Sequence, residues 1–133
     1  MKFSFTVYME PVPKARARIS IKNGKAWAYT PSKTLKAELT IRDAFMKIAD
    51  GEFFERNIPV KLTVSFFRAK PASTSKKVLL PITAPDIDNY IKTILDSLRN
   101  YAFVSDAQVT NIQAVKRFGF PPRVEIEIIE DEQ

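Results

Sequence analysis

The chain contains no cysteine and no histidine. The lack of cysteine excludes disulfides, thiolate metal sites and cysteine nucleophiles, and it fits a reducing compartment. The lack of histidine removes the commonest general base and the usual zinc ligand. A metal site in this protein therefore has to be built from oxygen ligands, which suit magnesium, calcium or manganese.

Long apolar runs are also missing. No stretch approaches the roughly 18 consecutive apolar residues that a membrane span requires, and the N-terminus lacks the pattern of a signal peptide. The chain has 133 residues, of which 45% are hydrophobic and 27% charged, and this composition is typical of a globular protein. We therefore predict a single domain over residues 1–133, located in the cytoplasm.

The net charge of +6 is unevenly distributed along the chain. Residues 1–77 hold 16 lysines and arginines against 6 acidic residues, whereas residues 78–133 hold 5 against 9. A basic half joined to an acidic half fits a polyanion-binding surface beside a carboxylate metal site, because basic side chains neutralise phosphates and carboxylates hold cations. An ordinary solvated surface explains the charge alone equally well.

Alternating apolar and polar residues predict strands at residues 3–9, 60–67, 109–117 and 123–129. Helical periodicity predicts two helices. The first begins with Thr30 as N-cap and Pro31 as first helical residue and ends near Asp50, and the second runs from about Asp86 to about Arg99. The order β(β)αβαββ predicts an α+β fold, in which a mixed β-sheet carries two main helices packed on one face.

The first predicted helix carries two apolar stripes. One stripe is expected to face the sheet and contains Ala37, Ile41, Ala44, Phe45 and Ile48. The second stripe is a candidate for contact with another copy of the chain, although burial within the monomer explains it nearly as well; it contains Leu35, Leu39 and Met46. The second helix has a single apolar stripe, formed by Ile87, Ile91, Ile94, Leu95 and Leu98.

Two basic segments lie between these elements. The first contains the turn sequence Asn23-Gly24, which predicts a basic hairpin or loop, and its charges are Lys14, Arg16, Arg18, Lys22 and Lys25. The second, over residues 68–85, is a loop by composition and contains Arg68, Lys70, Lys76 and Lys77.

The acidic residues concentrate on and around the second predicted helix. Asp88, Lys92 and Asp96 lie at i, i+4 and i+8, so they share one face of that helix. Asp86 can place its carboxylate beside Asp88, and the loop after the helix is expected to return Asp106 to the same region. Clustered carboxylates raise each other's pKa unless a cation compensates them, and a divalent metal is the usual compensation.

Each of these residues also has a purely structural interpretation. Asp86 fits a plain N-cap, Asp88 with Lys92 fits a solvated ion pair worth a few tenths of a kcal/mol, and Asp96 fits a surface charge. For any single aspartate this is the better interpretation. Four acids, a lysine and Asn89 within about 20 residues exceed what solvation requires, and the set therefore favours a functional site.

The acidic pattern resembles the RusA-type Holliday junction resolvases, which are endodeoxyribonucleases common in phages and prophages. The residues that carry the resemblance are Asp86-Ile87-Asp88-Asn89, Lys92, Asp96-Ser97-Leu98 and Asp106-Ala107-Gln108-Val109. Weaker similarities cover the opening strand, the basic residues 14–18, Thr30-Pro31-Ser32 and the last two strands. One position departs from the family, which often has two adjacent aspartates before Ala-Gln-Val, because here the first of them is Ser105.

The resemblance implies a homodimer that binds branched DNA such as Holliday junctions. It implies that the protein hydrolyses paired phosphodiester bonds near the crossover with Mg²⁺, for which Mn²⁺ is a substitute. The implied metal ligands are Asp86, Asp88 and Asp106. Lys92 then faces the scissile phosphate or forms an ion pair with Asp88 or Asp96. Asp96 and Asn89 are implied to lie next to the ligands without binding the metal, and Asp96 holds Lys92 in position.

Backbone phosphates are the expected partners of the basic residues, namely Lys14, Arg16, Arg18, Arg68, Lys70, Lys76 and Lys77. Two other hypotheses stay open. A protein of the same fold that binds nucleic acid without cutting it would fail a cleavage assay. An interaction protein whose basic half binds an acidic partner would show no magnesium dependence.

Overall fold

The computed structural model describes residues 1–15 and 18–133. In chain order its elements are β1 (Lys2–Val7), β2 (Arg18–Lys22), β3 (Lys25–Tyr29), α1 (Ser32–Ala49), β4 (Val60–Arg68), α2 (Ile87–Leu98), the 3₁₀ turn η1 (Asp106–Gln108), β5 (Val109–Phe118) and β6 (Arg123–Glu130). Within these residues, no helix is both long and apolar enough to cross a membrane.

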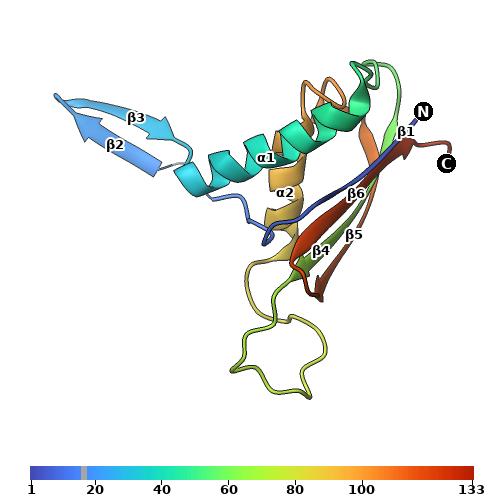
Figure 1. Cartoon of the computed structure of the whole chain (residues 1–133). Coiled ribbons are helices and arrows are strands. Elements are labelled where there is room, and N and C mark those ends of the chain that lie inside the picture. Colours follow the sequence, from blue (N-terminus) through green and yellow to red (C-terminus); the bar gives the residue numbers. More distant parts are fainter. Residues whose placement is uncertain (16–17) are drawn as a thin grey trace.

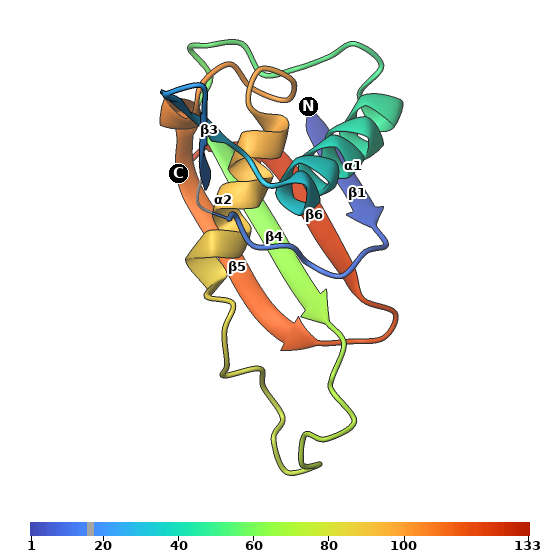
Figure 2. The same ribbon diagram turned by 90° about the vertical axis from the view of Figure 1, so that its left-hand side faces the viewer.

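Four strands form a mixed sheet in the order β1-β6-β4-β5. The β1/β6 and β4/β6 pairs are antiparallel, whereas β4 and β5 are parallel and are joined through α2. Helices α1 and α2 lie side by side on the same face of this sheet (Figures 1 and 2). The predicted α+β fold, a mixed sheet with two helices on one face, is therefore confirmed.

The core lies between the sheet and the two helices. On β4, side chains alternate between burial against the helices and partial exposure on the other face, as a half-buried strand requires. Phe45 of α1 meets Phe3 of β1 edge to face, with ring centroids 5.0 Å apart. Tyr90 of α2 stacks on Phe66 of β4 at 5.1 Å. These aromatic contacts fix both helices on the sheet.

Helix α1 starts one residue later than predicted. Pro31, not Thr30, occupies the N-cap position, because its ψ of 143° is extended and its carbonyl accepts the first helical hydrogen bond, from the amide of Leu35. The helix ends as expected, at Asp50 and Gly51 in the left-handed region. The prediction that Ile48 faces the core is wrong: it is 46% exposed, and the charged Glu38 is buried instead.

The buried face of α2 is rotated from the predicted stripe. Ile94 and Leu98 are buried as expected, but Tyr90, Thr93 and Ser97 are buried with them, while the other predicted stripe residues are only partly covered. The hydroxyl of Ser97 can be buried because it donates a hydrogen bond to the Thr93 carbonyl, four residues earlier, at 2.6 Å. Helix α1 packs against α2, and the guanidinium of its Arg42 donates to the Ser97 carbonyl at 3.1 Å.

Strands β2 and β3 form a separate antiparallel hairpin that projects from the body near the start of α1 (Figure 1). Its turn is Asn23-Gly24 with φ of 54° and 74°, the two positive values that a type I′ turn needs. The predicted basic hairpin is thus confirmed. Residues 69–85 form a second projection, a long loop at one end of the sheet.

Candidate active site at the two ends of helix α2

The first turn of α2 exposes two predicted metal ligands. Asp86 is the N-cap residue, and its backbone carbonyl accepts hydrogen bonds from the amides of Asn89 and Tyr90, at 3.2 and 3.4 Å. Its side chain makes no capping hydrogen bond, so the carboxylate stays available. Asp88 lies exposed in the same turn, where the positive end of the helix dipole favours an anion.

The chain just before Asp86 is held by two basic side chains. Arg68 donates to the carbonyls of Thr83 and Ala84, at 3.4 and 3.1 Å. Lys116 donates to the carbonyls of Thr83 and Pro85, both at 2.9 Å. The base of the 69–85 loop is therefore fixed to the ends of β4 and β5. As a result, Asp86 has a defined position although it follows a long loop.

Further along α2, Lys92 is exposed and points away from the core. In the described part of the chain it makes no ion pair, so neither of the predicted pairings of Lys92, with Asp88 or with Asp96, forms there. Asn89 is exposed too, and its carbonyl accepts from the amide of Lys14 at 2.9 Å. Because Lys92 is exposed and makes no ion pair within the described residues, its amine can contact a phosphate.

The other end of α2 holds a second acidic group. The Asp96 side chain is only 9% exposed and lies 3.2 Å from the guanidinium of Arg99. The same guanidinium lies 3.0 Å from Oδ2 of Asp106. The second carboxylate oxygen of Asp106, Oδ1, is buried and has no hydrogen-bond partner in the described residues. An orphaned carboxylate oxygen is a ready acceptor for a cation or a proton.

Lys14, in the segment before β2, links Asp96 of α2 to Glu38 of α1. Its amine lies 2.9 Å from Asp96 and 2.7 Å from Glu38, and its side chain is 20% exposed. Burial alone would lower the pKa of Lys14, but hydrogen bonds to Glu38 and Asp96 outweigh it and raise the pKa above the ordinary value. Lys14 is therefore charged at neutral pH, and its charge is already neutralised by two carboxylates.

The structure does not bring the three predicted ligands together within one chain. Asp86 and Asp88 lie at the start of α2, whereas Asp106 pairs with Arg99 just beyond its end. Asp96, which shares the Arg99 guanidinium with Asp106, lies eight residues beyond Asp88, a rise of about 12 Å along the helix. Among residues 1–15 and 18–133, no three acidic side chains are grouped closely enough to hold one metal ion. The expected return of Asp106 to the start of the helix is thus wrong for a single chain.

The predicted phosphate contacts differ in their surroundings. Arg68 and Lys14 are occupied as described above, and Lys70 donates to the carbonyl of Val78 at 2.7 Å. Lys76 and Lys77 are exposed on the loop and are free to meet phosphates. Arg16 lies outside the described residues, as does the side chain of Arg18, whose backbone begins β2.

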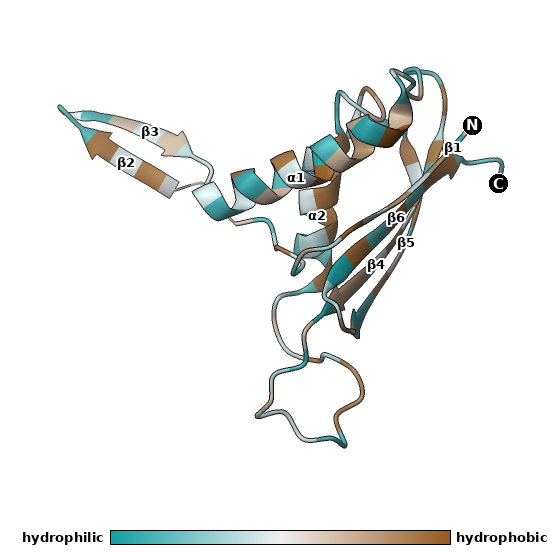
Figure 3. Ribbon diagram, in the orientation of Figure 1, coloured by the Kyte–Doolittle hydropathy of each residue, from teal (hydrophilic) through white to brown (hydrophobic). Residues whose placement is uncertain are grey.

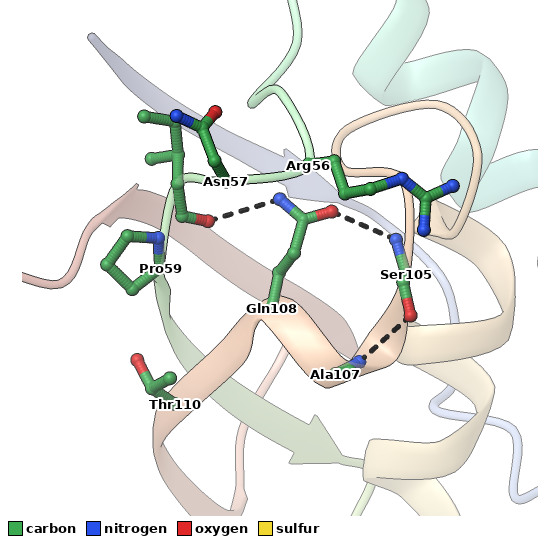
Figure 4. A pocket seen from close by; sticks show the side chains of 8 residues that line it. Arg56, Asn57, Pro59, Ser105, Ala107, Gln108 and Thr110 are labelled. Carbon is green, nitrogen blue, oxygen red and sulfur yellow. Dashed lines mark hydrogen bonds between the residues drawn. The ribbon is translucent and has the colours of Figure 1, made fainter.

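A shallow hollow of about 290 Å³ lies beside η1 (Figure 4). Within it, the side chain of Gln108 accepts from the amides of Val104 and Ser105 and donates to the carbonyls of Glu55 and Ile58. The hydroxyl of Ser105 accepts from the amide of Ala107. These hydrogen bonds fix the loop before η1 to residues 55–58. Ser105, which departs from the family pattern, serves as the N-cap of η1.

Sequence reasoning missed two residues of this region, Glu38 and Arg99, and predicted no role for a third, Gln108. Glu38 contacts Lys14 across 24 sequence positions, and no local pattern signals such a pair. Arg99 stands three residues after Asp96, and that spacing is a weak signal for their contact. Gln108 belongs to the motif Asp-Ala-Gln-Val, but its role is to hold the loop that carries Asp106.

Exposed carboxylates at a helix start, directly after the projecting basic loop 69–85, form the chemistry expected of a protein that acts on nucleic-acid phosphates. Comparison with known proteins agrees. The family model for endodeoxyribonuclease RusA matches residues 9–129. The chain therefore belongs to the RusA endodeoxyribonuclease family, as its sequence predicts.

Two similar proteins extend over nearly the whole chain. The crossover junction endodeoxyribonuclease rusA of Lactococcus phage r1t is 33% identical over 137 residues, which cover 98% of this chain and 99% of the phage protein. The uncharacterized protein YqaN of Bacillus subtilis (strain 168) is 33% identical over 139 residues, which cover 95% of this chain and 94% of that protein. The similarity thus includes both ends of α2 and both basic projections.

Proposed function

We propose that this protein is a magnesium-dependent, structure-selective endodeoxyribonuclease that resolves four-way DNA junctions by cutting paired strands near the crossover. Membership of the RusA family and the near full-length similarity to a phage crossover junction enzyme support this substrate. The observation that carries the proposal is the pair of exposed carboxylates at the start of α2, Asp86 and Asp88, with the exposed amine of Lys92 on the same helix; none of the three is paired within residues 1–15 and 18–133.

The residues at the start of α2 fit a magnesium ion. Magnesium is usually held by one or two carboxylates and keeps several waters, so Asp86 and Asp88 can hold it, and Asp106, the third predicted ligand, would add to them. Bound magnesium supplies Lewis acidity toward a phosphoryl oxygen and a more acidic water. Manganese, which also prefers oxygen ligands, is the expected substitute.

The chain itself supplies binding and charge. Lys92 stabilises the negative charge that builds on the reacting phosphate, because its amine is exposed and unpaired within the described residues. Lys76 and Lys77 contact backbone phosphates of a junction arm. Asp96 holds Arg99, and Arg99 in turn orients the carboxylate of Asp106.

Symmetric cutting of a junction needs two sites related by a two-fold axis, and a homodimer supplies them. The second stripe of α1 supports a dimer, because Leu35, Leu39 and Met46 are each 45–47% exposed. A dimer would also allow Asp106 to join the metal site of the other copy. Since Asp86 and Asp106 lie at opposite ends of α2, a metal held by all three aspartates would take Asp106 from the second copy. Sedimentation showing an active monomer would remove the dimer from the proposal.

The proposal is tested by incubating the purified protein with labelled linear duplex, fork and four-way junction DNA, with and without magnesium. We expect paired cuts in the junction, only with magnesium, and little cutting of the linear duplex. Binding without cutting under all conditions would favour the alternative, a catalytically inactive nucleic-acid-binding protein of the same fold. Equal cutting of all three DNAs would remove the structure selectivity.

A further inference from the structure

The β2–β3 hairpin exposes large side chains that a folded protein normally covers. Every residue of β3 is exposed, including Trp27 at 45% and Tyr29 at 44%, and on β2 Ile19 and Ile21 are 74% and 75% exposed. Figure 3 shows hydrophobic stretches in this projection, away from the sheet. A two-stranded hairpin is only marginally stable by itself in water, so these side chains point to a partner.

The two faces of the hairpin differ in chemistry. Directly paired residues of antiparallel strands share a face, and successive residues alternate between faces. The pairs Ser20/Trp27 and Lys22/Lys25 therefore lie on one face together with Tyr29, which we name the aromatic face. The pairs Ile19/Ala28 and Ile21/Ala26 form the opposite, aliphatic face.

Charge on the aromatic face favours a polyanion. Lys22 and Lys25 lie directly opposite each other, and like charges in that position repel unless an anion lies over them. The surrounding sequence offers no such anion, because residues 11–37 contain seven lysines and arginines and no acidic residue. Lysines beside exposed aromatic rings are the usual elements of a single-strand or unpaired-base binding surface.

Spacing along β3 fits a nucleic-acid base. Trp27 and Tyr29 are two residues apart on the same face, which places them about 7 Å apart along the strand. Bases stack at about 3.4 Å, so rings with this separation can hold one base between them. We propose that the aromatic face of the β2–β3 hairpin binds DNA at the branch point, where Trp27 and Tyr29 stack on unpaired or unstacked bases and Lys22 and Lys25 contact phosphates. This inference rests on the proposed junction substrate.

Trp27 is the single tryptophan of the chain, so all tryptophan emission reports on this face. The experiment titrates the protein, in EDTA to prevent cutting, with unlabelled four-way junction, linear duplex or heparin. We expect the junction to quench the emission with the same saturation curve as a gel-shift measurement. Heparin, which offers charge without bases, should bind without comparable quenching.

Variants separate the two faces. Trp27→Ala with Tyr29→Ala should weaken junction affinity by about 5-fold to 150-fold, since each base stacked on an aromatic ring contributes about 1–3 kcal/mol. Trp27→Phe, which keeps a ring, should bind nearly as well as the parent. The matched control Ile19→Ala with Ile21→Ala changes the aliphatic face of the same strands and should leave affinity unchanged.

Failure of this inference is distinct from failure of the proposed function. If the junction is bound and cut but tryptophan emission stays unchanged at saturation, the aromatic face does not touch DNA and the inference is overturned. Emission that is already blue-shifted in the free protein and insensitive to DNA would overturn it in favour of a second protein copy on this face. If no DNA is bound or cut, the proposed function itself fails.

Discussion

The amine of Lys14 lies 2.9 Å from the carboxylate of Asp96, so the segment that leads into the hairpin is joined to the last turns of α2. The same amine reaches Glu38 of α1 at 2.7 Å. One lysine therefore neutralises two nearly buried carboxylates from two helices. Sequence alone favours Lys14 as a phosphate contact, but these distances favour a role in stability.

Lys14→Ala is expected to destabilise the protein by about 1–3 kcal/mol, because it leaves buried acceptors without their partner. Urea unfolding followed by circular dichroism measures this change. The matched control is Lys22→Ala in the exposed hairpin turn, which should stay within about 0.5 kcal/mol of the parent. Equal stability of Lys14→Ala and the parent would show that the ion pairs contribute nothing.

The contribution of Lys14 should depend on pH. Because the folded-state pKa is raised above 10.5, stabilisation is fully present below that value and is lost as the pH rises through the higher folded-state pKa. The difference in unfolding free energy between the parent and Lys14→Ala should therefore be constant around neutral pH and shrink at strongly alkaline pH. A difference that grows with alkaline pH would contradict the raised pKa.

Lys92→Ala should lower the cleavage rate while keeping junction affinity, since its charge acts on the reacting phosphate. The double variant Lys76→Ala with Lys77→Ala should do the opposite. It should weaken binding and reduce the slope of log affinity against log salt by about one for each phosphate that is no longer neutralised. Single-turnover cleavage and salt-dependent gel shifts measure the two effects. Weaker junction binding by Lys92→Ala with a normal cleavage rate would assign that lysine to binding.

Mixing two inactive variants tests whether the site spans two chains. In a dimer of Asp88→Asn with Asp106→Asn, one site keeps both aspartates if they come from different copies, and neither site does if they come from one copy. We expect the mixture, refolded together, to nick one strand of the junction, while each variant alone is inactive. An inactive mixture that still forms mixed dimers would place the whole site within one chain.

Much of the fold could be predicted because its signals are local. The alternation in residues 60–67 and 123–129 predicts strands β4 and β6 nearly to their ends, since a half-buried strand has a period of two. The Asn23-Gly24 turn is equally local. The buried face of α2 was less predictable, because it includes the polar residues Thr93 and Ser97, which an apolar periodicity does not mark.

The candidate site was predictable only in part. The positions of Asp86 and Asp88 follow from the helix start, which the sequence marks clearly. The position of Asp106 depends on the conformation of residues 99–105, including Asn100 at φ 70°, and no periodic signal predicts that path. The partners of Lys14 lie on other elements, so only the three-dimensional structure identifies them.

The placement of the active site at the start of α2 is tested by Asp88→Asn, which keeps the shape of the side chain and removes its charge. Cleavage and binding of a labelled four-way junction are measured on the same preparation with magnesium present. We predict that cleavage is abolished while affinity stays within a few fold of the parent, because binding depends mainly on phosphate contacts from other residues. Cleavage by Asp88→Asn at the parental rate would contradict the placement of the active site at the start of α2.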